Sequence, residues 1–257
     1  MRPLAYFFLL PLFVLFFSSC QKEISGEIAR PTDTTRTRGT GGTLGSSFLV
    51  KTYTEDITTA SGNLKVTFDL KYDISDRIVS MISRANAGDK FVYQYSANKF
   101  TMDLFNSNVL SIHMDCFLNN MQLIDSSLQY NDTRDTSTEK YSYNSAKQLT
   151  QKKEYEYNRS VAILIDKIAY EYDAVGNVVI ETGLSATTTY TYATQVNNLN
   201  FGQIYFSQSK NLPTKTITSG AGGGTINHTY TVDSLNRVTS EKAISNDGNV
   251  LIRTYTY

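Results

Sequence analysis

The chain of 257 residues has no Trp, four Pro, two Cys and two His, and its 24 basic side chains balance its 24 acidic ones. A charge balance of this kind argues against a nucleic-acid partner, which needs a basic surface. Tyr, in contrast, is abundant, with 18 residues. Aromatic and β-branched side chains suit the pleated, half-buried surface of strands better than helices. The composition therefore predicts an all-β protein.

Residues 1–19 have the pattern of an export signal, which is set aside before the fold is considered. Arg2 gives a positive start, and residues 4–17 form an apolar run too short for the ~20 residues of a membrane span. The sequence Phe17-Ser-Ser-Cys20 resembles the lipobox of bacterial lipoproteins, although Phe17 stands where Leu is commoner. The resemblance implies that Cys20 becomes the lipidated first residue of the mature chain. The alternative is an ordinary secretory signal with an incidental Cys.

Residues 20–47 are expected to be the lipidated Cys and a flexible tether. They are poor in apolar side chains and rich in Gly, Thr and charge, so that burial cannot offset the entropy of ordering them. Residues 21–23, Gln-Lys-Glu, resemble the export signal that sends some lipoproteins to the outer face of the outer membrane. We therefore expect an outer-membrane lipoprotein, exposed at the surface or else on the periplasmic face.

Cys116 is the second Cys and has no free thiol to pair with if Cys20 carries lipid. No disulfide is expected in the mature chain. Cys116 lies between Asp115 and Phe117 in an expected strand, with no His or basic residue near it in sequence to lower its pKa. We interpret it as a small buried hydrophobic side chain rather than a reactive thiol.

From residue 48 to 257 the chain repeats a β-hairpin unit at intervals of roughly 22 to 34 residues. Each unit has an aromatic or apolar residue directly before a polar turn. These residues are Tyr72, Tyr95, Phe117, Tyr143, Tyr172, Phe206 and Val232, and an eighth copy ends at Tyr257. The residues two positions earlier are Leu70, Tyr93, Asp115, Tyr141, Tyr170, Ile204, Tyr230 and Tyr255. Because side chains alternate along a strand, both sets share one aromatic face and the other face is polar.

The turns that follow carry side chains able to accept bonds from nearby backbone N–H groups. They are Asp73, Ser96, Asn144, Asp173, Ser207 and Asp233. Three residues later, Asp76, Gly176 and Asn236 are types that tolerate positive φ. At the Phe117 copy, Leu118 takes the position that starts the turn.

About sixteen strands of ~5–10 residues follow one another as an antiparallel meander of hairpins. Isolated hairpins are only marginally stable, so that neighbours must pair edge to edge, and so wide a sheet is expected to twist and bend. The sequence predicts a single sheet curled into a barrel-like or spiral form.

The unit Tyr170-Glu-Tyr-Asp-Ala-Val-Gly-Asn-Val178, with relatives at 68–78, 141–149 and 230–238, resembles the YD repeat of the Rhs and teneurin families. Together with the lipobox, the tether and the stretch 209–213, the array is even more similar to a family of secreted bacterial lipoproteins of unknown function with a porin-like fold. The resemblance covers residues 48–257 and implies a shape rather than an activity.

No residue pattern indicates a catalytic, cofactor or metal site. His113 and His228 each fall four residues before the end of a repeat, where Phe68 and Phe91 stand in other copies, so that repeat register accounts for them. No His-Glu-x-x-His, Cys-x-x-Cys or phosphate-binding loop occurs. The turn carboxylates lack the clustering that a Ca²⁺ site needs.

These observations favour a non-enzymatic, lipid-anchored envelope or surface protein with a binding or scaffold role. Its expected partners are the membrane, through the N-terminal lipid, and a glycan or protein ligand at the envelope, because Tyr-rich surfaces are common in recognition. Most of the rings are nevertheless expected to form the core or fill the barrel. Two alternatives remain open, namely an integral outer-membrane β-barrel and a repeat-shell fragment of an Rhs-type toxin system.

Overall fold

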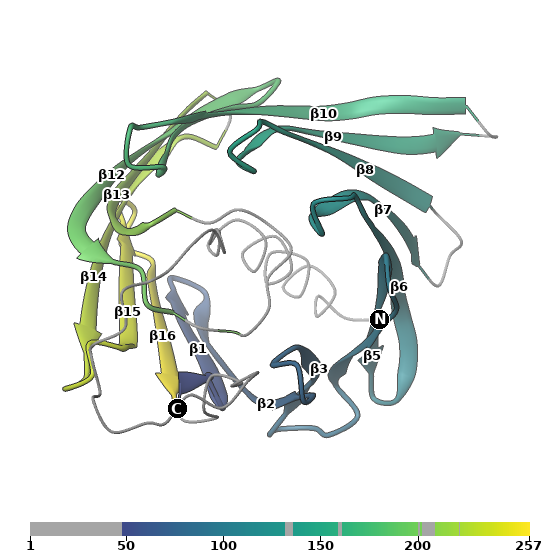
Figure 1. The fold of residues 1–257 in the computed structure, drawn as a ribbon. Coiled ribbons are helices and arrows are strands. Elements are labelled where there is room, and N and C mark those ends of the chain that lie inside the picture. The colour runs from purple at the N-terminus through teal and green to yellow at the C-terminus, as the bar shows by residue number, and fades with distance from the viewer. Residues whose placement is uncertain (1–47, 132–135, 159–160, 200, 202–208, 221) are drawn as a thin grey trace, which may run out of the picture.

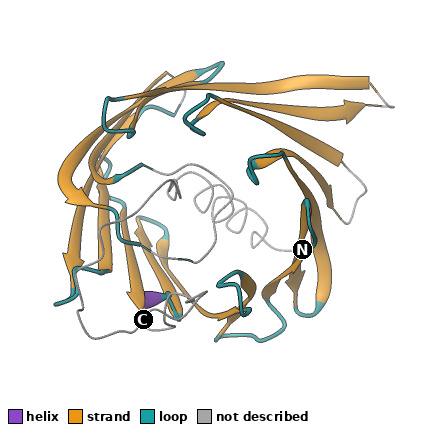
Figure 2. Ribbon diagram, viewed as in Figure 1, coloured by secondary structure: helices purple, strands orange, loops and turns teal. Residues whose placement is uncertain are grey.

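A computed structural model describes residues 48–131, 136–158, 161–199, 201, 209–220 and 222–257. Within them, sixteen antiparallel strands form one closed barrel (Figures 1 and 2). They are β1 (Thr52–Thr59), β2 (Gly62–Tyr72), β3 (Ile78–Ser83), β4 (Lys90–Tyr95), β5 (Lys99–Asn106), β6 (Val109–Leu118), β7 (Ile124–Asn131), β8 (Thr136–Tyr143), β9 (Leu149–Asn158), β10 (Val161–Tyr172), β11 (Val178–Thr182), β12 (Ala186–Val196), β13 (Asn211–Gly220), β14 (Gly224–Val232), β15 (Val238–Ser245) and β16 (Val250–Thr256).

Each strand pairs with its neighbours in sequence, and β1 closes the ring by pairing with β16 in the register Thr52↔Thr256. The predicted all-β hairpin meander is confirmed, and of the two forms expected the protein adopts the barrel. Closure pairs the edges of β1 and β16, which in an open sheet would expose unpaired N–H and C=O groups.

The predicted aromatic face lines the barrel interior, except at the Phe117 copy described below; Ile204, Phe206 and the turn residue Ser207 lie outside the described residues. Tyr53, Phe68, Phe91 and Tyr141 are buried there and belong to one apolar cluster with residues from most of the strands. The alternate positions, such as Thr54 and Thr67 on β1 and β2, point outward.

Six tyrosines tie neighbouring hairpins together. Each hydroxyl donates a hydrogen bond of 2.6–2.9 Å to a backbone carbonyl near the start of an earlier strand or, for Tyr72, just before β1. The pairs are Tyr72–Val50, Tyr95–Ile78, Tyr143–Ile124, Tyr172–Leu149, Tyr192–Val178 and Tyr257–Val238. The repeat thus encodes a polar contact as well as ring burial.

We expect Tyr143→Phe and Tyr257→Phe each to destabilise the barrel by about 1 kcal/mol, because each removes one hydrogen bond and leaves a carbonyl short of a donor. The loss is measured by equilibrium urea unfolding. Tyr155→Phe, on the outer wall beside Lys140, is the matched control. A loss in the Tyr155 variant equal to that in the two others would refute a specific role for these contacts.

The turns form as predicted at Asp73, Asp173 and Asp233. Asp73 Oδ1 accepts bonds from the N–H groups of Ser75 (2.8 Å) and Arg77 (3.0 Å). φ is 58° at Asp76, 103° at Gly176 and 60° at Asn236. The Asp carboxylates therefore hold the turns.

The prediction for the Phe117 hairpin was wrong by one residue. Leu118, not Phe117, pairs with Ile124 at the end of the strand and packs against the core, and Asn119 starts the turn by accepting bonds from backbone N–H groups. Phe117 and Asp115 therefore face outward. This register buries Met114 and Cys116, whereas the predicted one would have buried the charged Asp115.

Candidate functional site

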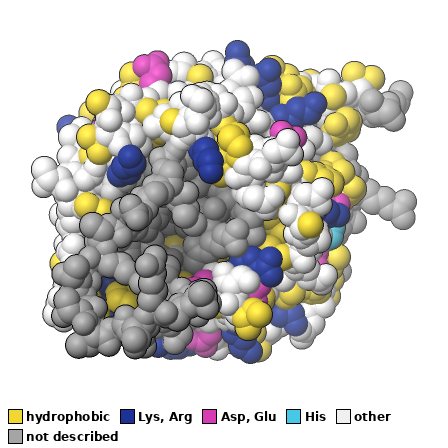
Figure 3. All heavy atoms as spheres, in the orientation of Figure 1, with side chains coloured by type: hydrophobic (Ala, Val, Ile, Leu, Met, Phe, Trp, Pro, Cys, Tyr) yellow, Lys and Arg dark blue, Asp and Glu magenta, His cyan; other side chains and the backbone are white. Residues whose placement is uncertain are grey.

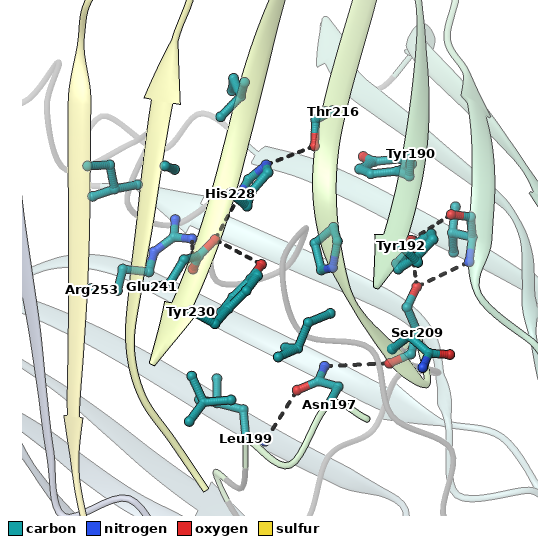
Figure 4. Close-up of a pocket in the computed structure, with 18 of the residues that line it drawn as sticks. Tyr190, Tyr192, Asn197, Leu199, Ser209, Thr216, His228, Tyr230, Glu241 and Arg253 are labelled. Atoms are coloured by element: carbon teal, nitrogen blue, oxygen red, sulfur yellow. Dashed lines mark hydrogen bonds and ion pairs between the residues drawn. The ribbon is translucent and has the colours of Figure 1, made fainter. Parts of the chain in front are cut away.

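A cavity of ≈ 190 Å³ lies inside the barrel against β11–β16 (Figure 4). Its wall combines aromatic rings with polar and charged side chains. The polar and aromatic members are Glu181, Tyr190, Tyr192, Asn197, Ser209, Asn211, Thr216, His228, Tyr230, Glu241, Arg253 and Tyr255. Successive inward positions of adjacent strands supply most of them, which places groups distant in sequence side by side.

A hydrogen-bonded network of charged and polar side chains crosses five neighbouring strands, β1 and β16 to β13, and most of its members line the cavity. Arg253 on β16 donates from Nε to Glu55 Oε1 on β1 (3.0 Å) and from Nη1 to Glu241 Oε2 on β15 (2.9 Å). Glu241 Oε1 lies 2.9 Å from Nδ1 of His228 on β14, whose Nε2 lies 3.0 Å from Thr216 Oγ1 on β13. Figure 4 shows Glu241 between His228, Tyr230 and Arg253.

Burial alone would raise the pKa of Glu241, but its bond to His228 and the charge of Arg253 outweigh burial and lower the pKa to about 2. Burial would likewise lower the pKa of Arg253, yet the Glu241 carboxylate raises it well above the ordinary value. The pair is therefore ionised at neutral pH, inside the barrel.

One buried oxygen of this network has no hydrogen-bond partner among the described residues, namely Glu55 Oε2. The side chain of Glu55 is only 1 % exposed, and its other oxygen accepts bonds from Arg253 and from the Tyr53 hydroxyl. An unsatisfied buried acceptor costs free energy, which a hydrogen-bond donor would recover.

Glu181 is a second carboxylate of the cavity wall, and its pKa is raised. Burial is the main cause, and a hydrogen bond from Tyr190 and the charge of Lys152 only partly oppose it. Burial therefore destabilises the ionised form of this carboxylate. A binding site commonly holds such a group, because its partner arrives with the ligand.

We expect Glu181→Gln to stabilise the protein at neutral pH by on the order of 1 kcal/mol. The folded-state pKa is raised, so that Glu181 favours folding only below its unfolded pKa and disfavours it as the pH rises through the folded pKa. The gain in Tm should appear at pH 7 and vanish near pH 4 in scanning calorimetry. A gain of the same size at both values would contradict a destabilised carboxylate.

A separate polar group lies inside the barrel on β8 and β9. Lys152 Nζ lies 2.8 Å from Glu139 Oε1, and Glu139 also accepts bonds from the Tyr141 and Ser127 hydroxyls. Burial and Glu139 together raise the pKa of Glu154 nearby. The interior is thus polar on two sides.

His228 occupies the inward position that repeat register predicts, and the structure places it in the cavity wall. His113 does not, because the slip at Phe117 turns it outward, where its ring lies 2.5 Å from Asp103 and 3.3 Å from Asp115. Cys116 is buried, as predicted, and burial raises its pKa. Cys20, the predicted lipidation site, lies outside the described residues.

Sequence reasoning missed Glu55, Glu181, Glu241 and Arg253. A signal was present, since each stands at an inward position of its strand, where most repeats carry apolar or aromatic residues. In the described part of the chain, no cluster of three or more His, Cys, Asp or Glu has the arrangement of a metal site. Nor does any helix there have the length and apolar character to cross a membrane.

Comparison with known proteins gives a fold but no family. The chain superposes on a porin-like protein from Bacteroides uniformis with a TM-score of 0.62 at 14% identity, covering 80% of this chain and 97% of that one. A porin-like protein from Bacteroides vulgatus gives 0.57 at 13% identity, covering 81% and 98%. No protein-family model and no curated protein matches. The chain therefore has a porin-like β-barrel fold.

Proposed function

We propose that this protein is a lipid-anchored, non-enzymatic binding protein of the outer membrane, whose barrel stands in water and takes its ligand into the interior cavity. The observation that carries the proposal is the polar character of much of the outer wall. Ile217, Ile244 and Ile252 face outward as well, but the outward positions of β1, β12 and β14 carry Thr52, Thr54, Thr187, Thr189, Thr191, Thr225, Asn227, Thr229 and Thr231.

A barrel that spans a bilayer needs the opposite arrangement, with an apolar band ~25 Å tall facing lipid. Here ion pairs also stand on the outer wall, including Lys65–Asp56 and Lys99–Asp115. Transfer of such groups into hydrocarbon would cost several kcal/mol for each charge. A polar outer wall of this kind accords with attachment through a lipid on Cys20.

The chemistry of the cavity favours a hydroxyl-rich ligand such as a glycan fragment. Tyr190, Tyr192 and Tyr230 offer ring faces and hydroxyls together, and Glu181 offers a carboxylate acceptor whose pKa is raised by burial. Sugar hydroxyls supply donors, and sugar C–H faces pack on rings. A strongly anionic ligand is disfavoured by Glu181 and Glu241.

A glycan array followed by isothermal titration with soluble cell-wall fragments tests this proposal. Ala243 lines the cavity, so that Ala243→Leu should fill it and weaken binding at least ~10-fold by steric exclusion. Thr229→Leu, on the outer wall of the neighbouring strand, is the matched control and should bind normally. No binding to any envelope or dietary polymer, or equal loss in both variants, would overturn the glycan role.

The porin-like fold also supports a second candidate, an integral outer-membrane barrel. Expression of residues 21–257 without detergent separates the two, because this segment contains every described strand. We expect a monodisperse, soluble β protein. Aggregation that detergent alone reverses would favour the membrane barrel. Lipidation is tested independently, since Cys20→Ser should abolish incorporation of labelled fatty acid and release the protein from membranes.

A further inference from the structure

Three lysines stand side by side on the outer wall of β8, β9 and β10. Lys140 pairs with Lys153, and Lys153 pairs with Lys167, so that the three form a row across neighbouring strands, here called the basic ladder. Directly opposed side chains have Cβ atoms about 4.5–5.5 Å apart, and like charges at that spacing repel.

The basic ladder differs from three other cations of the outer wall in lacking a carboxylate partner, and from Lys71, Lys215 and Lys242 in that its lysines stand directly opposite one another. Lys65, Arg84 and Lys99 each have a carboxylate within 4 Å, at Asp56, Asp69 and Asp115. No ion pair links any ladder lysine to a carboxylate in the described part of the chain, and Lys140 lies instead over the Tyr155 ring at 5.7 Å. A row of unneutralised charge therefore faces outward from three adjacent strands.

The β9–β10 hairpin beyond the ladder exposes several apolar side chains, whereas Glu154 and Glu156 stand on the inward face of β9. Val161, Ile163, Leu164 and Tyr157 are 64, 47, 43 and 43 % exposed, and we call them the apolar tip. Consecutive residues of β10 point to opposite faces, so the tip is exposed on both sides of the hairpin. Figure 1 shows β9 and β10 extending beyond the ring of the other strands, and Figure 3 shows Lys and Arg side chains gathered over this part, with hydrophobic ones beyond them.

The basic ladder and the apolar tip follow one another along the strand direction on the same outer wall. On the outward face of β9, Lys153 is followed by Tyr155 and Tyr157, the last about 13 Å further on at ~3.3 Å per residue. Peripheral membrane proteins present this order to a bilayer, with basic groups at lipid phosphates, aromatic rings at the interface and aliphatic groups in the acyl region.

We propose that the outer wall of β8–β10 docks on an anionic lipid bilayer, with the apolar tip inserted and the basic ladder against the headgroup phosphates. A second copy of the chain is a poorer occupant, because a symmetric contact would oppose one ladder to another. β1 and β9 run in the same direction, so the tip and Phe48 lie at opposite ends of the barrel. At ~3.3 Å per residue, the ~28 residues expected as the anchored tether can pass the wall to reach the same bilayer.

The test uses residues 21–257, which lack the lipid, and co-sedimentation with phosphatidylcholine vesicles with or without phosphatidylglycerol. We expect binding only to the anionic vesicles. Lys140→Gln/Lys153→Gln/Lys167→Gln should weaken it on the order of 100-fold, at about five-fold for each lysine near an anionic surface. The control Lys71→Gln/Lys215→Gln/Lys242→Gln removes the same charge from other strands of the wall and should retain most of the binding.

The absence of Trp from the chain gives a direct readout of insertion. Val161→Trp should shift its emission to the blue on adding anionic vesicles, and Thr229→Trp, on β14, should not. Absence of vesicle binding, equal loss in both triple variants, or no shift at Val161→Trp would each overturn the proposal. A blue shift that depends on protein concentration without vesicles would assign the tip to self-association instead. None of these results depends on the ligand of the cavity.

Discussion

Replacing Arg253 by Met is expected to destabilise the barrel by about 3–5 kcal/mol, the largest effect of any single substitution considered for this chain. Arg253 is buried and bonds both Glu55 and Glu241. Its loss removes the guanidinium that bonds two buried carboxylates, Glu55 on β1 and Glu241 on β15, one on each side of β16. Equilibrium urea unfolding of residues 21–257 measures the change.

Two further variants separate burial of charge from simple loss of an ion pair. Arg84→Met removes a cation paired with Asp69 at the surface, where solvent screens the interaction, and should leave the unfolding midpoint nearly unchanged. The triple variant Glu55→Gln/Glu241→Gln/Arg253→Met removes the stranded charges and should recover much of the loss. If Arg253→Met were no less stable than Arg84→Met, the network would not be a buried one.

The strands could be predicted well because the residues that define each hairpin lie close together in the sequence. Period-two alternation, the terminal aromatic residue and the turn acceptor at Asp73, Asp173 and Asp233 all lie within about ten residues of each other. The same local logic failed at Phe117, where aromatic character suggested the end of a strand. There the cost of burying Asp115 decided the register. This cost becomes evident only when the side chains on the two faces of β6 are compared.

The contact between Glu55 and Arg253 could not be predicted from the sequence, for a different reason. Glu55 and Arg253 are 198 residues apart, and they meet only because β1 pairs with β16. Hairpin patterns are equally consistent with an open spiral, in which this pair would not form. Closure therefore adds Glu55 to the charged network, and closure depends on the combined twist and tilt of all the strands.

The second large effect is a loss of stability in acid that depends on Glu241. The folded-state pKa of this carboxyl is about 2, against an ordinary value of 4.5. A lowered folded pKa contributes stability above the unfolded pKa and loses it as the pH falls toward the folded one. A difference of about 2.5 pH units corresponds to roughly 3 kcal/mol, lost between about pH 5 and pH 2. Urea unfolding at a series of pH values should show this slope.

Glu241→Gln should flatten the acid limb and should also lower stability at neutral pH, because Arg253 and His228 then lose their anionic partner. Glu55, Arg253, His228 and Tyr230 all remain around the substituted side chain, so the change in slope isolates one carboxyl. Asp69→Asn, on the outer wall, is the control and should keep the wild-type slope. If the free energy of unfolding had the same pH dependence in both variants, the acid loss of stability would not come from Glu241 but from another group.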